Sequence, residues 1–209
     1  MGLVFGWCGF AAAAEPVTIA ALGDSLTQGY GMAQADGFVP QLQAWLDAQG
    51  AKVTLINAGV SGDTTAGGAA RVAWTLTPDV DAMIVALGGN DMLRGLAPAD
   101  ARSNLDSILR AAQQAGVEVL LVGMRAPGNF GPDYKTEFDA LYPALAQEYG
   151  TGFVPDFLGA ITGDGADPSA INGRMQADGI HPNPAGVALI VQALGPSVLD
   201  LAARAATKE

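Results

Sequence analysis

The alternation of short apolar runs with longer amphipathic segments most constrains how this chain can fold. Segments with helical spacing cover 38–49, 64–76, 98–115, 134–149 and 184–206. The apolar runs read as strands and cover 17–22, 52–56, 80–87, 117–122 and 152–154. They are mostly continuous rather than alternating, which is typical of strands buried on both faces. Strands that alternate with helices predict an α/β protein whose five-stranded parallel sheet is covered on both sides.

The composition fits one globular domain. The chain has 209 residues, of which 50% are hydrophobic and 15% charged, so an intrinsically disordered acidic protein is excluded. The net charge of −11 would repel phosphate backbones and anionic lipid headgroups, and the three lysines, Lys52, Lys135 and Lys208, form no basic patch. We therefore expect no nucleic-acid partner.

The N-terminal segment differs from the rest of the chain. Residues 1–14 carry no charge, and their apolar run ends in four alanines, which predicts a secretory signal with cleavage after Ala13 or Ala14. A buried first strand is the alternative. The run is too short to span a membrane, so we expect a periplasmic or secreted protein without stable membrane insertion. The only cysteine, Cys8, lies in this segment, so the mature chain would have no disulfide, thiolate metal site or catalytic cysteine.

Three segments with chemically useful residues follow directly after predicted strands: Gly23-Asp24-Ser25, 59–63 and Gly89-Asn90-Asp91. Because ligands bind at the carboxyl ends of strands in open parallel sheets, we expect the three to meet at one rim. Ser25 alone is more typical of a helix cap than of a nucleophile. A phosphate-binding loop is excluded because no lysine precedes Lys52, and the Gly-x-Ser-x-Gly elbow is excluded by Thr27.

The only histidine occurs near the C-terminus, in Asp178-Gly179-Ile180-His181-Pro182. A serine nucleophile needs a base, and the base needs an acceptor that orients it. On a tight turn, Asp178 could accept from one imidazole nitrogen while the other faces the serine. If the chain is a serine hydrolase that uses histidine, His181 is therefore the only candidate for the base.

Acyl transfer also needs donors aimed at a developing oxyanion. The Gly62 N–H allows close approach, the Asn90 side chain supplies a neutral donor, and Ser25 N–H would complete a three-donor hole. Each of these residues alone is equally typical of a turn.

Taken together, Gly23-Asp24-Ser25-Leu26, Gly62, Gly89-Asn90-Asp91 and Asp178-x-x-His181-Pro182 resemble the four blocks of the GDSL, or SGNH, hydrolase family. The match covers nearly the whole chain, 15–209, in the family's order. The resemblance implies a flavodoxin-like, three-layer α/β/α fold. It also implies Ser25 as nucleophile, His181 as base, Asp178 as its orienting acceptor, and Ser25, Gly62 and Asn90 as the oxyanion hole.

Val60-Ser61-Gly62-Asp63-Thr64 and Leu87-Gly88-Gly89-Asn90-Asp91 are similar to the periplasmic thioesterase I, lysophospholipase L1 and arylesterase branch of that family. In that branch the segment after the asparagine acts as a flap over the acyl chain. The resemblance therefore implies substrate-binding roles for Met92, Leu93, Arg94, Gly95 and Leu96.

The resulting expectation is a monomeric serine esterase of broad specificity that uses neither a metal nor a cofactor. Its substrates would be carboxylic esters, thioesters or lysophospholipids. Two alternatives remain open: a carbohydrate O-acetylesterase, and a non-catalytic binding module that keeps the same fold.

Overall fold

The computed structural model describes residues 16–163, 171 and 173–207, so the expected signal segment, 1–14, lies outside the described residues. A single parallel sheet organises the fold, with the strand order β2-β1-β3-β4-β5. Its strands are β1 (Val17–Gly23), β2 (Val53–Gly59), β3 (Ala82–Ala86), β4 (Glu118–Val122) and β5 (Gly152–Val154). This order is that of flavodoxin-like sheets, and the predicted five-stranded parallel sheet is confirmed.

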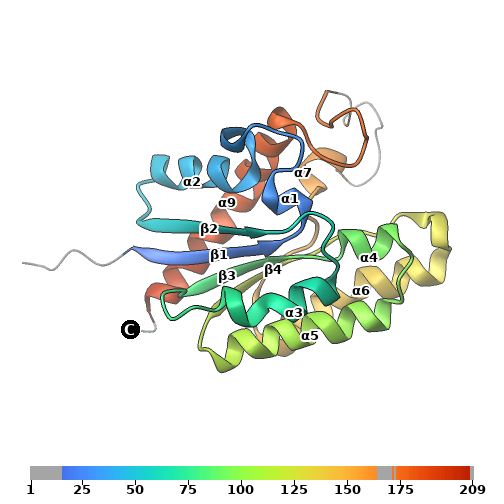
Figure 1. Ribbon diagram of the computed structural model, residues 1–209, viewed down its shortest axis with the longest axis horizontal. Helices are drawn as coiled ribbons and strands as arrows, with labels where there is room; N and C mark the ends of the chain where they lie inside the picture. Colours follow the sequence, from blue (N-terminus) through green and yellow to red (C-terminus); the bar gives the residue numbers. More distant parts are fainter. Residues whose placement is uncertain (1–15, 164–170, 172, 208–209) are drawn as a thin grey trace, which may run out of the picture.

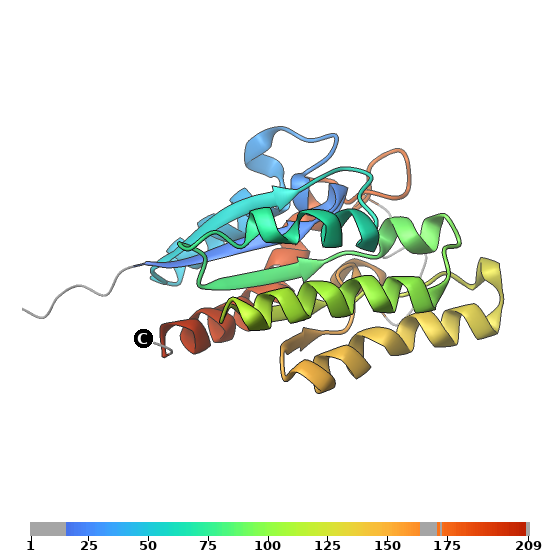
Figure 2. The same ribbon diagram turned by 60° about the horizontal axis from the view of Figure 1, so that its bottom comes forward.

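Helices cover both faces of the sheet, which confirms the three-layer α/β/α arrangement (Figure 1). On one face lie α2 (Phe38–Ala48) and α9 (Pro184–Ala206), and on the other lie α3 (Thr65–Thr75), α5 (Pro98–Gln114) and α6 (Pro132–Tyr149). Figure 2 shows α5 and α6 side by side. The shorter helices are α1 (Ser25–Gln28), η1 (Gln34–Asp36), α4 (Gly89–Leu93), η2 (Gly128–Phe130) and α7 (Gly159–Thr162).

The apolar character of the strands follows their place in the sheet. β3 lies between two strands and beneath both helical layers, and all of its residues are buried. β2 lies at the edge, and several of its side chains are exposed. It also extends to Gly59, beyond the expected end at Ile56, because Asn57 and Ala58 continue the pairing with β1 in spite of their weak apolar character.

Among the described residues, α9 is the one helix that by length and composition could cross a membrane. In this fold it packs against α2 and against four strands of the sheet. Its buried side chains include Val187, Ile190, Val191, Leu194, Val198 and Leu201. We therefore interpret α9 as a core helix.

The strand register brings three connecting segments to one edge of the sheet. Gly23 at the end of β1 pairs with Gly59 on one side and Ala86 on the other. The chain therefore leaves the three strands at one level, at the point where the strand order reverses around β1. The structure confirms the predicted convergence of the segments after these strands at one rim.

Candidate active site

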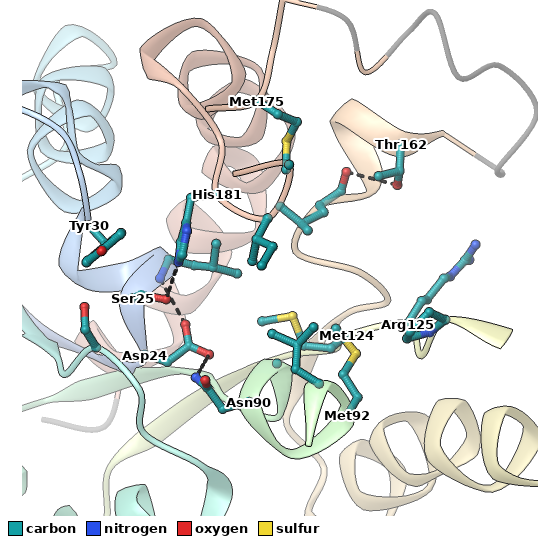
Figure 3. A pocket seen from close by; sticks show the side chains of 18 of the residues that line it. Asp24, Ser25, Tyr30, Asn90, Met92, Met124, Arg125, Thr162, Met175 and His181 are labelled. Carbon is teal, nitrogen blue, oxygen red and sulfur yellow. Dashed lines mark hydrogen bonds between the residues drawn. The ribbon is translucent and has the colours of Figure 1, made fainter. Parts of the chain in front are cut away.

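Ser25 is the first residue of α1, directly after β1. The Asp24 side chain caps this helix by accepting from Leu26 N at 3.0 Å. Ser25 therefore does not act as the cap, and as the first helical residue its backbone N–H has no acceptor within the helix. Its hydroxyl lies 2.8 Å from Nε2 of His181, across 156 positions of sequence (Figure 3).

His181 and Asp178 form one local unit in the segment before α9. The Nδ1 atom of His181 lies 2.6 Å from Oδ2 of Asp178. The other carboxylate oxygen accepts from the backbone N–H groups of Ile180, at 2.9 Å, and of His181, at 3.0 Å. With Nδ1 donating to Asp178, Nε2 accepts from the Ser25 hydroxyl, so the three side chains form one hydrogen-bonded chain.

The hydrogen bonds to Asp178 also stabilise its negative charge. The bond from the His181 side chain and the two backbone N–H groups lower the pKa of Asp178 from 3.8 to about 2. Asp178 is thus ionised throughout the mildly acidic and neutral range, where it orients the imidazole. The tight turn is helped by Gly179, whose φ of +67° favours glycine, and whose N–H donates to Gln176 O at 3.0 Å.

Gly62 and Asn90 lie in the same cavity as Ser25 and His181. Gly62 belongs to the turn after β2, and Asn90 lies in α4, directly after β3. The Asn90 amide donates to Asp63 O at 2.9 Å and makes a longer contact of 3.4 Å with Oδ2 of Asp24. Residues from both neighbours of β1 therefore flank Ser25.

Asp24 is a buried carboxyl group next to the serine. It is 2% exposed, and burial raises its pKa from 3.8 to about 6. The bond from Leu26 N–H, the charge of His181 and the contact with Asn90 partly offset this effect. The ionised form of Asp24 therefore lowers the stability of the fold.

A cavity of about 500 Å³ opens beside these residues. Its lining is predominantly apolar and comes from segments that are far apart in the sequence: Leu26, Met92, Leu93, Met124, Pro127, Leu158, Ile171, Met175 and Ile180. The thioethers of Met92, Met124 and Met175 lie on the side of the cavity away from Tyr30 (Figure 3). Methionine side chains adapt to ligands of different shape, and the volume suits a small organic group.

Comparison with known proteins agrees with this geometry. The GDSL-like lipase/acylhydrolase family model matches residues 21–189. The chain belongs to this family. It is 39% identical to esterase TesA of Pseudomonas aeruginosa over 88% of this chain and 89% of that protein. It is 38% identical to the thioesterase 1/protease 1/lysophospholipase L1 of Escherichia coli K12, over 83% of this chain and 78% of the relative.

A solved structure of AlinE4, an esterase of the SGNH-hydrolase family, is 43% identical to this GDSL-family chain and superimposes with a TM-score of 0.72. The match covers 90% of this chain and 98% of AlinE4. The predicted family and its fold are therefore confirmed.

The expected flap of this GDSL-family protein divides into two parts. Met92 and Leu93 lie in or at the end of α4 and line the cavity. The next residues contact protein groups: Arg94 donates to Gly62 O at 2.9 Å, and Leu96 O accepts from the Tyr134 hydroxyl at 3.0 Å. Gly95 has a φ of +63°, and a Cβ there would lie 2.7 Å from the Phe130 ring. Substrate contact by Arg94, Gly95 and Leu96 stays a prediction.

Two carboxylate side chains near the site, Asp63 and Asp91, have structural roles that the sequence did not indicate. Asp63 directly precedes the helix predicted at 64–76 and is a residue type that often caps helices, but Thr64 caps α3, and Asp63 instead pairs with Arg71 at 2.7 Å. The same arginine donates to Gly23 O at 2.9 Å, and so ties the end of β1 to the turn after β2. Nothing in the sequence around Arg71 indicates that this helical arginine connects the two segments.

Asp91 is the second such group, and it is 1% exposed. It accepts from the backbone N–H of Thr65 at 2.8 Å and from its hydroxyl at 2.6 Å. Asn90 thus faces the cavity while its neighbour Asp91 holds the start of α3. The helical geometry of α4 separates the two roles, which a list of motif residues does not reveal.

Tyr30 was also missed. Its ring centroid lies 4.8 Å from that of His181, and its carbonyl accepts from the Gln176 side chain at 2.8 Å. Gln176 also donates through its backbone to His181 O at 2.8 Å. The segment after α1 therefore contacts both the histidine ring and the segment that carries it.

Within the described residues, no group of three or more His, Cys, Asp or Glu side chains is placed to hold a metal ion. The expectation that the reaction needs no metal or cofactor stays a prediction.

Proposed function

We propose that this chain is a serine esterase of broad specificity that hydrolyses carboxylic esters and thioesters through an acyl-enzyme. The observation that carries the proposal is the continuous chain from Ser25 Oγ to His181 Nε2, 2.8 Å, and from His181 Nδ1 to Asp178 Oδ2, 2.6 Å. The family and the names of the relatives, esterase and thioesterase/lysophospholipase, support the same reaction class.

In the first half-reaction, Ser25 Oγ attacks the carbonyl carbon while His181 Nε2 takes the hydroxyl proton. Asp178 stabilises the imidazolium that forms. As the tetrahedral intermediate collapses, His181 gives the proton to the leaving alcohol or thiol, and the acyl group stays on Ser25. A water molecule then attacks the acyl-enzyme with His181 again as base, which releases the acid and restores the serine.

The oxyanion would be held by the N–H groups of Ser25 and Gly62 and by the Asn90 side chain. In the structure the Asn90 amide already donates to Asp63 O at 2.9 Å, while its contact with Asp24 is the longer one at 3.4 Å. The hydrogen that faces Asp24 is therefore the one we assign to the oxyanion. The bond to Asp63 would keep the amide plane in place during this exchange.

The apolar cavity favours an acyl chain over a sugar as the bound group. Its lining offers many carbon and sulfur atoms but few hydrogen-bonding groups, whereas an acetylated carbohydrate needs several polar partners. We also propose that the protein acts outside the cytoplasm, on the basis of the uncharged, alanine-rich segment 1–14.

The test is a series of p-nitrophenyl esters from acetate to palmitate, run beside an acyl-CoA and a lysophospholipid. A folded Ser25→Ala variant should lose turnover and should no longer react with a serine-directed phosphonate. Ser61→Ala is the matched control because Ser61 lines the same cavity, so the phosphonate should still label that variant. Hydrolysis of acetylated sugars alone would favour the O-acetylesterase, and a wild-type protein that the phosphonate does not label would favour a binding module.

A further inference from the structure

The turn that carries Gly62 has a defined type. Asp63 N donates to Val60 O at 3.1 Å, so 60–63 form a hydrogen-bonded β-turn with Gly62 at its third position. Gly62 has a φ of +84°, and no non-glycine residue in the described part of the chain has a positive φ, so Ser61 does not. This combination identifies a type II turn rather than its mirror-image type I′.

The turn type sets the direction of the Gly62 N–H. This N–H belongs to the peptide between the second and third residues of the turn, and the types I and II differ chiefly in the orientation of that peptide. A change of turn type would therefore turn the Gly62 N–H away from its present direction. Whatever stabilises the type II form also stabilises one orientation of this donor.

Two side-chain hydrogen bonds hold the turn. The Ser61 hydroxyl is hydrogen-bonded to the Gln28 side chain, which fixes the side toward α1. From the other side, Nη2 of Arg94 donates to Gly62 O at 2.9 Å. Arg94 thus contacts the residue whose backbone conformation defines the turn.

Arg94 also belongs to the segment that borders the apolar cavity. Directly before it, Met92 and Leu93 line the cavity, and directly after it Gly95 packs against the Phe130 ring. Tyr134 anchors the end of the segment through its hydrogen bond to Leu96 O. The position of Arg94 therefore depends on how residues 92–96 pack against the cavity, Phe130 and Tyr134; we call this segment seated when it packs as in the structure.

We propose that Arg94 is a positioning residue that links the seating of residues 92–96 to the orientation of the Gly62 N–H. The proposal rests on the serine esterase function proposed above. When the segment is seated, the guanidinium holds Gly62 O, and the type II turn aims the donor at the oxyanion. Arg94 then acts on the transition state through Gly62, rather than on the ground-state acyl chain.

If Arg94 has this role, replacing it should lower kcat and leave KM nearly unchanged. An exposed hydrogen bond contributes about 0.5–1.5 kcal/mol, so Arg94→Met should lower kcat about 2- to 10-fold on acetyl and decanoyl esters alike. KM should stay within about twofold for both, since uniform substrate binding is not what the residue supplies. The Ki of a trifluoromethyl ketone, whose Ser25 adduct carries an oxyanion, should rise by the same factor as kcat falls.

The matched control is Arg102→Met, the same substitution at an arginine on α5 that pairs with Glu148 of α6 at 2.8 Å rather than with the turn at 60–63. It should leave kcat and Ki unchanged. An Arg94→Met variant that raises KM for the decanoyl ester alone, with unchanged kcat and Ki, would show a substrate contact and overturn the proposal. Unchanged values throughout would overturn it as well.

A second measurement separates this proposal from the proposed function. In ¹H–¹⁵N NMR spectra, Arg94→Met should shift the amide signals of Gly62 and Asp63, and Arg102→Met should not. If the wild-type protein hydrolyses no ester, the esterase function fails and these signals still decide whether Arg94 holds the turn. Unshifted signals for Gly62 and Asp63 would overturn the proposal whatever the activity.

Discussion

Replacing Asp24 by asparagine should make the fold more stable at neutral pH. The carboxyl group has a pKa of about 6 in the folded protein and 3.8 as an unperturbed group, chiefly because it is buried. The folded state therefore binds this proton more tightly than the unfolded state does. As the pH rises from 3.8 to 6, the unfolded chain releases the proton first, so this group makes the fold progressively less stable.

The size of the effect follows from the two pKa values. Their separation corresponds to about 3 kcal/mol of lost stability above pH 6. Asparagine cannot ionise, and its side-chain oxygen can still cap α1 through Leu26 N–H, since Asn and Asp cap helices equally well. Its amide group cannot accept from Asn90, which forfeits about 1 kcal/mol. Asp24→Asn should therefore be about 2 kcal/mol more stable at pH 8 and no more stable than wild type at pH 4.

Urea unfolding at pH 4, 6 and 8 measures this difference directly. The exposed turn residue Asp79 provides the matched control, and Asp79→Asn should show no comparable gain between pH 4 and 8. The lowered pKa of Asp178 contributes stability that is present above pH 3.8 and lost as the pH falls through about 2, but both proteins share it, so it cancels. A gap between Asp24→Asn and wild type that is the same at all three pH values would refute the reasoning.

Two further substitutions test the close contacts around the serine and the cavity. A Cβ on Gly59 would lie 2.4 Å from Gln28 N, so Gly59→Ala should displace α1, cost about 1–3 kcal/mol of stability and lower turnover. The control is Gly128→Ala, whose Cβ would meet nothing within 4 Å, and it should leave thermal unfolding unchanged. Leu93 lines the cavity and is 49% exposed, so Leu93→Ala should raise KM for a decanoyl ester about fivefold, from about 1 kcal/mol of lost apolar contact, and leave KM for the acetyl ester unchanged; equal changes for both esters would contradict this role.

The strands could be predicted because burial on both faces demands continuous apolar runs, and β3 satisfies this demand completely. Their ends could not, because pairing with a neighbour decides them. β2 continues through Asn57 to Gly59 since β1 offers hydrogen-bonding partners there, whatever the side chains. Likewise, Thr64 rather than Asp63 caps α3, because Asp63 is engaged by Arg71 from the next turn of that helix.

In the candidate site, contacts between residues close in sequence could be predicted, whereas contacts between distant segments could not. The pairing of His181 with Asp178 follows from their spacing on a tight turn, and the structure brings both to Ser25. The contact between Tyr30 and His181 depends on how two remote loops pack. No spacing rule could have indicated it, nor the bond from Arg94 to Gly62 O, because each partner is chemically unremarkable in its own segment.

The sheet topology explains why the site is assembled from such remote segments. β2 and β3 flank β1, and their last residues pair with Gly23 at the same level. Ser25, which follows β1, therefore has the turn after β2 and the helix α4 beside it, and the Asn90 side chain of α4 donates to Asp63 O of that turn at 2.9 Å. A fixed register of backbone hydrogen bonds brings these segments to one level, and the side chains of Arg71 and Arg94 then hold the turn after β2 in place. Substitutions of exposed helix residues that contact none of these segments should therefore leave the site intact, whereas a group that enters the space between β2 and α1 should disturb the serine and the turn together.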